Sequence, residues 1–543
     1  MSFDTERSIN CDVLIIGGGG AGLRAAIAAA STGADVLMAS KTRMGRASNT
    51  YLSKAIIASS GWGDPGDRGP VHGQDTIKGG RYINDPGMVA RFTETIPRET
   101  RRLMEWGMKF NSAPDGSPAV MKIPGHTHAR HLSGKNWKGS DLVFPLRQKA
   151  VEMGVRFQEK TFVTSLLVSD QKVIGATALT TQGEFLTLGA KTIVLATGGF
   201  GHLFLNTNNA PGITGDGHAL ALDAGVALQD MEFVQFYPTA MGRRGSRILL
   251  YERILVQDGV VLKNSRGQDI LKKNKYPAEE ITRDELAQVM MKEILANPGE
   301  AIFMDLEGLA PKTARELAML IPAPYFKGTR TFPVVPTTHF CMGGVVVDAH
   351  CETSCQGLFA AGEVCAGAHG ANRLGGNALA EVIAMGSLAG QAAGKRAGAL
   401  DPVPGISEAA RKEKTRLGKL FSRQGEGPAD LIRELKETMW IHAGILRSGQ
   451  SLEKALATLK KLEDTQARIE APKDLIRFLE FRNLKTTGKA LCRSALERTE
   501  SRGSHFRTDF PEENDSHWRI NLRVEKTGAG LALDRVPVPE IDG

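Results

Sequence analysis

The stretch Asp12–Ala30, DVLIIGGGGAGLRAAIAAA, constrains the fold of this chain most strongly. Val13–Ile16 is a short apolar run that predicts a buried strand, and Leu23–Ala30 is an alanine-rich run that predicts a helix. The glycines between them fit the pattern G-x-G-x-x-G at Gly17, Gly19 and Gly22. Such glycines allow a tight turn, close approach to a pyrophosphate and close helix packing, while the helix N-terminus attracts phosphates. We therefore predict a dinucleotide-binding unit at this point.

The next strand, expected over Ala34–Ser40, does not identify the nucleotide. Many NAD- and FAD-binding folds end this strand with an acidic residue that holds the adenosine ribose. This chain has Ser40 and Lys41 at that place. The simplest type of NAD site is therefore disfavoured, and the nucleotide stays open on this evidence alone.

Length and composition indicate a globular protein with several domains. The chain has 543 residues, of which 41% are hydrophobic and 24% charged, so a large core is expected. We expect a cytoplasmic protein, because the N-terminus is polar and no apolar run is long enough to span a bilayer. The net charge of +8 comes from scattered basic residues, so we expect small anionic ligands and no nucleic acid partner.

Neither the cysteines nor the histidines predict a metal centre. Of six cysteines, four lie between Cys341 and Cys365, but the spacing of Cys351 and Cys355 differs from that of ferredoxins. We expect reduced structural thiols, and any iron–sulfur cluster in another chain. The segment Gly125–Arg130, GHTHAR, holds two histidines, but a third ligand is not evident nearby.

The character of the chain changes twice along its length. From Met231 to about Pro336 it carries more charge and fewer Gly–Ala helices, which predicts an inserted α+β domain. Asp401–Gly405, DPVPG, breaks the chain, and Ile406–Ala495 is expected to be mostly helical. From about Phe510 onward we expect an irregular tail.

Some helix ends can be predicted from local signals. Asp85 can cap a helix that has Pro86 at its first position, and Pro97 should end or kink that helix. Ser451 can cap a later helix.

Seven motifs follow one another in a fixed order from about Asp12 to about Trp518. After the glycine-rich stretch they are IVLATGG (193–199), MEFVQFYPTAM (231–241), PTTHFCMGGV (336–345), GLFAAGEV (357–364), HGANRLGGNALAE (369–381) and RTESRGSHFRTDFP (498–511). This ordered set resembles the flavoprotein subunit of the succinate dehydrogenase and fumarate reductase family, to which L-aspartate oxidase is related. The resemblance implies FAD as the nucleotide, and the family shares the Ser40–Lys41 strand ending.

The resemblance also implies an architecture. It implies an α/β fold with a Rossmann-like FAD-binding domain in two parts, residues 1–230 and 337–400. Residues 231–336 would form an α+β capping domain over the flavin, 406–515 a helical domain and 516–543 a C-terminal tail. The helical part of relatives commonly faces an iron–sulfur electron-transfer subunit. We therefore expect such a partner. We also expect this chain to associate with the inner membrane only peripherally, through partner subunits.

The implied FAD contacts run along most of the chain. They are Gly17, Gly19, Gly20, Ala21 and Gly22 in the turn, Ser40 and Lys41 near the adenosine, Ser48, Asn49 and Thr50 near the flavin, Ala196, Thr197, Gly198 and Asp216 along the nucleotide, Glu363 at a cofactor hydroxyl, and Arg373, Asn377, Ala378 and Leu379 by the flavin ring.

One departure from the family concerns the flavin attachment. Membrane-bound members carry Ser-His-Thr with the flavin bonded to the histidine, whereas this chain has Ser48-Asn49-Thr50. A carboxamide cannot form that bond, so we predict non-covalent FAD. We also hypothesise a lower flavin potential, which favours reduction of a substrate.

The implied reaction moves a hydride between flavin N5 and one carbon of a C=C or CH–CH bond. Arg373 and His339 match the positions that clamp a substrate carboxylate, where charge builds in the transition state. Arg283, in an Arg-Asp pair that opens a helix, matches the proton donor, and Glu252 matches the glutamate that relays protons to it. The second relay arginine is replaced by Leu255, so this part of the route departs from the family.

The other end of the implied substrate pocket departs further. Tyr237 and Tyr251 stand where the family has a histidine and a threonine that hold the second carboxylate. Tyrosines supply neutral donors and bulk instead of charge. We therefore expect a dicarboxylate or a related unsaturated acid with an altered second end.

Two other functions stay open. The first is amino-acid oxidation as in L-aspartate oxidase, although that group reads RLASN where this chain has RLGGN at Arg373–Asn377. The second is a non-catalytic electron-transfer flavoprotein subunit, with its substrate pocket closed by Tyr237 and Tyr251.

Overall fold

A seven-stranded sheet carries the glycine-rich turn. The computed structural model describes residues 3, 5–243, 248–250, 260–276, 281–297, 299–310, 331–401 and 406–540. The strand order is β6–β2–β1–β9–β8–β7, and β16 pairs with β9. The strands are β1 (Glu6–Ile16), β2 (Val36–Ala39), β6 (Arg156–Gln158), β7 (Thr161–Ser169), β8 (Lys172–Thr180), β9 (Phe185–Leu195) and β16 (Leu358–Ala360). The predicted strand Val13–Ile16 is the buried end of β1, which pairs in parallel with β2 and β9.

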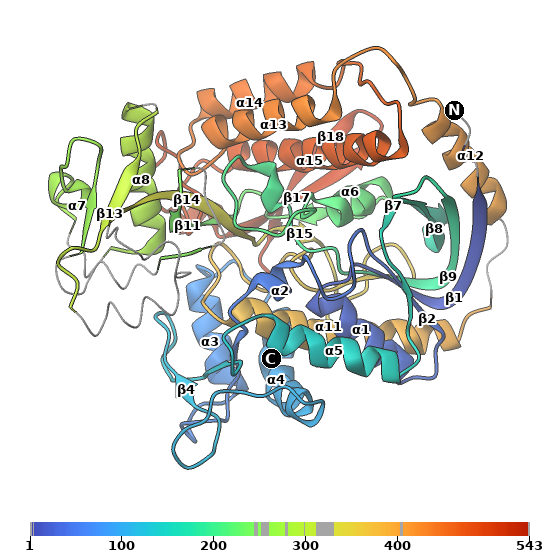
Figure 1. Cartoon of the computed structure of the whole chain (residues 1–543), viewed down its shortest axis with the longest axis horizontal. Coiled ribbons are helices and arrows are strands. Elements are labelled where there is room, and N and C mark those ends of the chain that lie inside the picture. Colours follow the sequence, from blue (N-terminus) through green and yellow to red (C-terminus); the bar gives the residue numbers. More distant parts are fainter. Residues whose placement is uncertain are drawn as a thin grey trace.

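Two long helices pack on this sheet through small residues. They are α1 (Gly20–Ala30), which follows the turn, and α11 (Asn377–Gly398). Gly386, Gly390 and Gly394 recur at every fourth position of α11. A Cβ atom added at Gly390 would lie 2.0 Å from the carbonyl oxygen of Ala25 on α1, so only glycine allows the two backbones to come this close. Figure 1 shows α1 and α11 together with α5 (Ser140–Glu152) on the lower side of the molecule.

The long helix α4 contains Pro97, which was expected to end or kink it. It spans Pro86–Glu105, and the carboxylate of Asp85 caps it by accepting from the N–H of Met88 at 2.9 Å. Pro97 does not end the helix, although an internal proline costs about 3 kcal/mol. Burial of an apolar face on both sides of Pro97 offsets that loss. This face consists of Phe92, Ile96 and Leu103.

The inserted segment forms a lobe with its own apolar core, at the left in Figure 1. Its sheet has the order β11–β14–β13–β12. The elements are β11 (Val234–Met241), β12 (Val261–Lys263), α7 (Ile270–Lys273), α8 (Arg283–Ala296), β13 (Ile302–Asp305) and β14 (Thr331–Cys341). β11 and β14 pair in antiparallel fashion, so the chain enters and leaves the lobe along neighbouring strands. The predicted domain borders remain proposals.

Four helices form most of the C-terminal part, along the top of Figure 1. They are α12 (Ile406–Gly418), α13 (Pro428–His442), α14 (Gly449–Lys461) and α15 (Pro472–Glu497). The cap of α14 was predicted at Ser451 but lies at Ser448, whose hydroxyl accepts from the N–H of Ser451 at 3.1 Å. The Ser451 hydroxyl lies inside the first helical turn and donates back to the carbonyl oxygen of Ser448 at 3.0 Å.

The chain end also differs from the prediction. Instead of an irregular tail, β17 (Ile520–Thr527) and β18 (Gly530–Pro537) form a hairpin. Leu522 and Val524 alternate toward the core, a two-residue period that the polar composition of this segment obscured. β17 also pairs with β10 (Leu228–Gln229), which pairs with β15 (Gly344–Val345), so the hairpin is joined to the centre of the molecule.

The remaining elements are short or lie at the edges. They are α2 (Asn49–Leu52), β3 (Ile56–Ala58), α3 (Gly69–Gly79), β4 (Val120–Met121), β5 (His131–Ser133), a 3-10 turn (Gly201–Leu203), α6 (Asp216–Asp223) and α16 (Asp515–Trp518).

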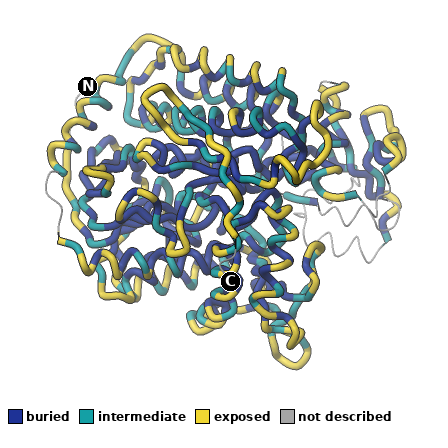
Figure 2. Tube along the Cα trace, turned by 180° about the vertical axis from the view of Figure 1, so that it is seen from behind, coloured by how far each residue is buried: buried dark blue, intermediate teal, exposed yellow. Residues whose placement is uncertain are grey.

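Figure 2 shows that buried residues fill the centre and that exposed ones follow the outer helices and loops. Within the described ranges, we find no helix that is both long and apolar enough to cross a membrane.

Arg498 ties the C-terminal motif RTESRGSHFRTDFP to the core. Its side chain is fully buried, and its Nε donates to Glu232 at 2.6 Å while its Nη1 donates to Glu500 at 3.1 Å. Removing one partner of a buried ionic cluster leaves uncompensated charge. The motif is therefore a structural clamp between the C-terminal part and the sheet.

We expect Arg498→Leu to lower the free energy of unfolding by about 3–5 kcal/mol, because the buried carboxylate of Glu232 loses the cation that bonds it, while Glu500 keeps Arg502 at 2.7 Å. Differential scanning calorimetry measures this as a lower unfolding temperature. Lys412→Ala is the control, since the ion pair of Lys412 with Glu408 is largely exposed. Equal unfolding temperatures for the two variants would show that the buried cluster is dispensable.

Candidate functional site

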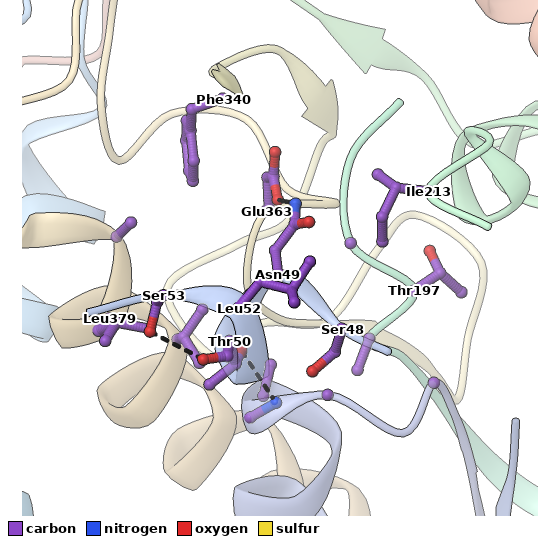
Figure 3. A pocket seen from close by; sticks show the side chains of 18 of the residues that line it. Ser48, Asn49, Thr50, Leu52, Ser53, Thr197, Ile213, Phe340, Glu363 and Leu379 are labelled. Carbon is purple, nitrogen blue, oxygen red and sulfur yellow. Dashed lines mark hydrogen bonds between the residues drawn. The ribbon is translucent and has the colours of Figure 1, made fainter. Parts of the chain in front are cut away.

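A deep cavity runs from the glycine-rich turn to the junction with the inserted lobe. Most of the predicted site residues line this cavity. They are Gly17, Gly19, Gly20, Ala21, Ser40, Lys41, Ser48, Asn49, Thr50, Ala196, Thr197, Gly198, Asp216, Tyr237, Arg283, His339, Glu363, Arg373, Ala378 and Leu379. The fold thus brings together side chains that lie more than 300 residues apart in the sequence. Figure 3 shows part of this wall from close by.

Two of the predicted residues that the structure describes stand apart from the cavity wall. Gly22 lies behind the turn, and a Cβ atom there would sit 2.0 Å from the carbonyl oxygen of Gly17. Asn377 is buried, and its amide donates to the Thr76 hydroxyl at 2.9 Å. Tyr251 and Glu252 lie outside the described residues.

Gly17 and Gly19 serve different purposes in the turn. Gly17 has φ +123°, and a Cβ atom there would lie 2.1 Å from the carbonyl oxygen of Ala196, so packing alone requires a glycine. At Gly19 the nearest atom to an added Cβ is 3.6 Å away, and the residue faces the cavity. Gly19 is also the N-cap of α1, so the positive end of that helix points into the cavity. This cradle suits a pyrophosphate.

Lys41 closes the cavity near the turn. Its ammonium lies 2.7 Å from Asp216 and 2.8 Å from Glu480 of α15. Burial alone would lower the pKa of Lys41, but the two carboxylates outweigh burial and raise it. Asn483, also on α15, donates to Asp216 at 2.9 Å. The C-terminal helices therefore help to shape the nucleotide end, which no local signal around Glu480 or Asn483 indicated.

The amide of Asn49 is held entirely by protein groups. Its Nδ2 donates to Asn209 at 2.7 Å and to Glu363 at 3.0 Å, and its Oδ1 accepts from the N–H of Ala210 at 2.8 Å. Figure 3 shows Asn49 pointing toward Glu363. Burial raises the pKa of Glu363, which also accepts from the N–H of Cys341 at 3.2 Å. Asn209 was not predicted, because nothing in its sequence surroundings marks it.

Cationic and neutral donors meet at the lobe end of the cavity. The guanidinium of Arg373 lies 4.8 Å from the Phe340 ring centroid and donates to Gln235 at 2.9 Å. The guanidinium of Arg283, the first residue of α8, lies 5.3 Å from the ring centroid of Tyr237. Burial, followed by the charge of Arg283, lowers the pKa of Arg373 to about 10. Arg373 therefore remains cationic at neutral pH.

His339 is a neutral donor beside these cations. Nδ2 of Asn208 lies 2.9 Å from Nδ1 of His339. An amide NH2 only donates, so Nδ1 accepts and the ring proton sits on Nε2. Burial, Arg373 and Arg283 all lower the pKa of His339 well below its usual value. Nε2 can then donate to a ligand at any working pH.

A hydrogen-bonded chain joins the lobe to the loop that carries Arg373. Asn372 donates to Asp284 of α8 at 2.9 Å, and Gln235 of β11 donates to Asn372 at 2.8 Å. Burial raises the pKa of Asp284 to about 6. The position of α8, and with it of Arg283, is thereby coupled to the position of Arg373.

Two buried polar atoms at the cavity lack a hydrogen-bond partner among the described residues. They are Nε of Arg373 and Oγ1 of Thr197. A buried polar group without a partner is costly, so a ligand that supplies acceptors and donors is expected there. The cradle at Gly19 and these two atoms fit a long polar cofactor with an anionic substrate beside it.

Comparisons with known proteins agree with this geometry. Residues 12–379 match the family model described as "FAD binding domain", and residues 432–539 match "Fumarate reductase flavoprotein C-term". The chain is 34% identical over 536 residues to one subunit of the fumarate reductase (CoM/CoB) of Methanothermobacter marburgensis, covering 95% of this chain and 97% of that protein. It is 33% identical to the fumarate reductase flavoprotein subunit of Escherichia coli, covering 93% and 89%.

The fold matches solved structures at similar identity. A quinol fumarate reductase FrdA variant from Escherichia coli has a TM-score of 0.89 at 30% identity, covering 99% of this chain and 98% of that chain. FAD is therefore the cofactor of this protein, and the residues present fit it.

We expect Gly19→Ala to weaken FAD binding at least tenfold, because the added methyl group enters the cavity while it fits against Ser48 and Thr50 at ordinary van der Waals distance. Fluorescence titration of the apoprotein with FAD measures the affinity. Gly398→Ala is the control, since Gly398 ends α11 with open space around it. Equal FAD affinity in both variants would remove the turn from the binding site.

We also expect acid precipitation of the holoprotein to release all of its flavin, because the amide of Asn49 has no chemistry for a covalent bond to FAD. The absorbance of pellet and supernatant at the flavin wavelength measures the split. Yellow colour retained by the washed pellet would contradict the prediction.

Proposed function

Because this chain belongs to the fumarate reductase and succinate dehydrogenase flavoprotein family, whose members are FAD-dependent oxidoreductases acting on CH–CH groups, we propose that it reduces the C=C bond of a dicarboxylate or related unsaturated acid. The observation that carries the proposal is the meeting of Arg373, Arg283 and neutral His339 at one end of the FAD cavity. The reverse oxidation of a CH–CH bond uses the same groups.

When bound, FAD exchanges a hydride equivalent at its N5 with one substrate carbon. Arg373 binds a substrate carboxylate with its planar donor fork, and its unpartnered Nε supplies a further donor. His339 donates from Nε2 to the same carboxylate. As charge moves onto the carboxylate in the transition state, these fixed donors stabilise it and polarise the C=C bond.

We assign proton delivery to Arg283. It opens α8, where the partial positive charge of the helix N-terminus disfavours a cation and so favours proton loss. The carbanion that develops next to the hydride-accepting carbon is basic enough to take a proton from a guanidinium. Glu252 is proposed to return a proton to Arg283.

The second end of the substrate faces Tyr237, whose ring lies 5.6 Å from that of His339 and beside Arg283. A phenol there offers one neutral donor and an apolar face. We therefore propose an acid whose second end is bulkier or less charged than a carboxylate, with Tyr251 contributing to the same end.

We further propose that electrons arrive through an iron–sulfur partner subunit. Several relatives are named flavoprotein subunits, and the Methanothermobacter marburgensis protein is likewise named as one subunit of a fumarate reductase. Any attachment to a membrane would then run through such partner chains.

Arg283→Ala should lower kcat by about 10²–10⁴-fold with normal FAD content, because the protonating group is lost. Oxidation of a reduced dye by an unsaturated acid measures turnover. Arg266→Ala is the matched control, an exposed arginine of the same lobe. Turnover in Arg283→Ala close to that of the control would show that the proton comes from another group.

The substrate class is tested with the same assay and a panel of unsaturated mono- and dicarboxylates. We expect turnover of at least one acid that carries an apolar or aromatic second end. Oxidation of L-aspartate, with no acid reduced, would favour the amino-acid oxidase function. No turnover at all by the FAD-loaded protein would favour an electron-transfer role.

A further inference from the structure

Three buried histidines lie behind the loop that follows Arg373. His126 belongs to the GHTHAR segment, His131 begins β5 and His72 lies on α3. All three are at most 4% exposed, and the ring centroids of His126 and His131 are 4.4 Å apart. Nε2 of His126 and Nε2 of His131 point at a backbone carbonyl group, and Nε2 of His72 points at a side-chain amide.

Two of these rings bond the same carbonyl group. Nε2 of His126 and Nε2 of His131 each lie 3.0 Å from the carbonyl oxygen of Gly375. Gly375 is two residues beyond Arg373 and lines the cavity. A carbonyl oxygen has two lone pairs, so it can accept from both rings at once.

The position of the His126 proton follows from its other neighbour. Nη1 of Arg130 lies 3.3 Å from Nδ1 of His126. A guanidinium only donates, so Nδ1 accepts and Nε2 carries the proton that points at Gly375. Arg130 is itself held at 2.8 Å by Asp67 and at 2.8 Å by Asp75. The chain of contacts therefore ends on two fixed carboxylates.

The next two residues of the loop meet the same cluster. Gly376 has φ +81°, and a Cβ atom there would lie 2.5 Å from Cδ2 of His131. Nε2 of His72 lies 2.8 Å from Oδ1 of Asn377. Residues 375, 376 and 377 are thus each in contact with one or more of the three histidines, at the point where α11 begins.

We propose that His126 and His131 are positioning residues, which hold the Gly375–Gly376 peptide and thereby the guanidinium of Arg373 at the substrate end of the cavity. The role in substrate binding rests on the proposed function, whereas the hold on the loop does not. In a trans peptide the N–H points away from the carbonyl, so the histidines direct the N–H of Gly376 to the opposite side, toward the cavity. Burial lowers the pKa of His126 to about 3 and also lowers that of His131, so both rings are neutral. His126 donates from Nε2, whereas Nδ1 of His131 also lies 3.1 Å from the carbonyl oxygen of Met121, so its single N–H is shared between two carbonyl groups.

The test uses two near-isosteric variants of His126 in the full-length, FAD-loaded protein. In His126→Gln the amide nitrogen can occupy the place of Nε2 and still donate to Gly375. In His126→Asn the amide reaches only the place of Nδ1, so the contact with Arg130 is kept and the bond to Gly375 is lost. His128→Asn is the control, because His128 belongs to the same segment but bonds Asp64 at 2.9 Å.

Hydrogen–deuterium exchange of the peptide covering residues 373–379 is the first readout. We expect exchange on the order of tenfold faster in His126→Asn, and exchange within about twofold of the wild type in His126→Gln and His128→Asn. The second readout is kcat/KM per bound FAD, which should fall about 10- to 100-fold in His126→Asn and recover to within about threefold in His126→Gln.

Unchanged exchange in His126→Asn, or a Gln variant that behaves like the Asn variant, would overturn the proposal. If an Asn variant does not load FAD, its Gln counterpart decides: loading and normal exchange support the donor role, and failure contradicts it. Faster exchange in His126→Asn, in a protein whose wild type reduces no acid, would refute the proposed function and leave the hold on the loop intact.

Discussion

Close contact between polypeptide backbones at glycines is the constraint on which the rest of this structure depends. Gly17 meets the backbone of Ala196, Gly22 meets that of Gly17, and Gly390 of α11 meets that of Ala25 on α1. A single methyl group at any of these positions would push elements of the sheet–helix core apart. The contacts bring the N-termini of α1 and α11 to the same cavity, one near the nucleotide end and one near Arg373.

Because α1 and α11 both begin at the cavity, its two chemically different ends are formed by rigid elements. The nucleotide end is completed by Lys41 and by Glu480 of α15, and the other end by the inserted lobe through Asp284 and Asn372. Asn49 lies between them, and its amide bonds side chains and backbone of the protein itself. The cavity wall is thus held by packing and hydrogen bonds across several segments, which fits the predicted non-covalent flavin.

Much of this could be predicted from the sequence. The β1–turn–α1 unit follows from local periodicity and glycine spacing. Most of the site residues implied by the ordered motifs line one cavity, and their roles there stay predictions. The sequence left alternatives open where a local rule met a stronger tertiary effect, as at Pro97, where the helix continues because its buried face stabilises it. The C-terminal hairpin was missed because its two-residue period is carried by only Leu522 and Val524 against a polar background.

Other residues carry no local signal at all. Glu480, Asn209 and the histidines that bond Gly375 become recognisable only when the fold brings them to the cavity, since their partners lie between 160 and 439 positions away in the sequence. A buried histidine whose partner is a distant carbonyl looks, in sequence, like any other core histidine. Such positioning contacts can therefore be identified in a three-dimensional structure but not from sequence motifs.

The central claim is that one cavity places FAD along the glycine-rich turn and an anionic substrate against Arg373. A crystal structure of the holoprotein with a non-reactive dicarboxylate tests it most directly. The account predicts the pyrophosphate at Gly19, the flavin ring beside Ala378 and Leu379, and a carboxylate within hydrogen-bond distance of both Arg373 and His339. A carboxylate bound elsewhere, or the space beside Arg373 filled by the side chain of Tyr237, would contradict it.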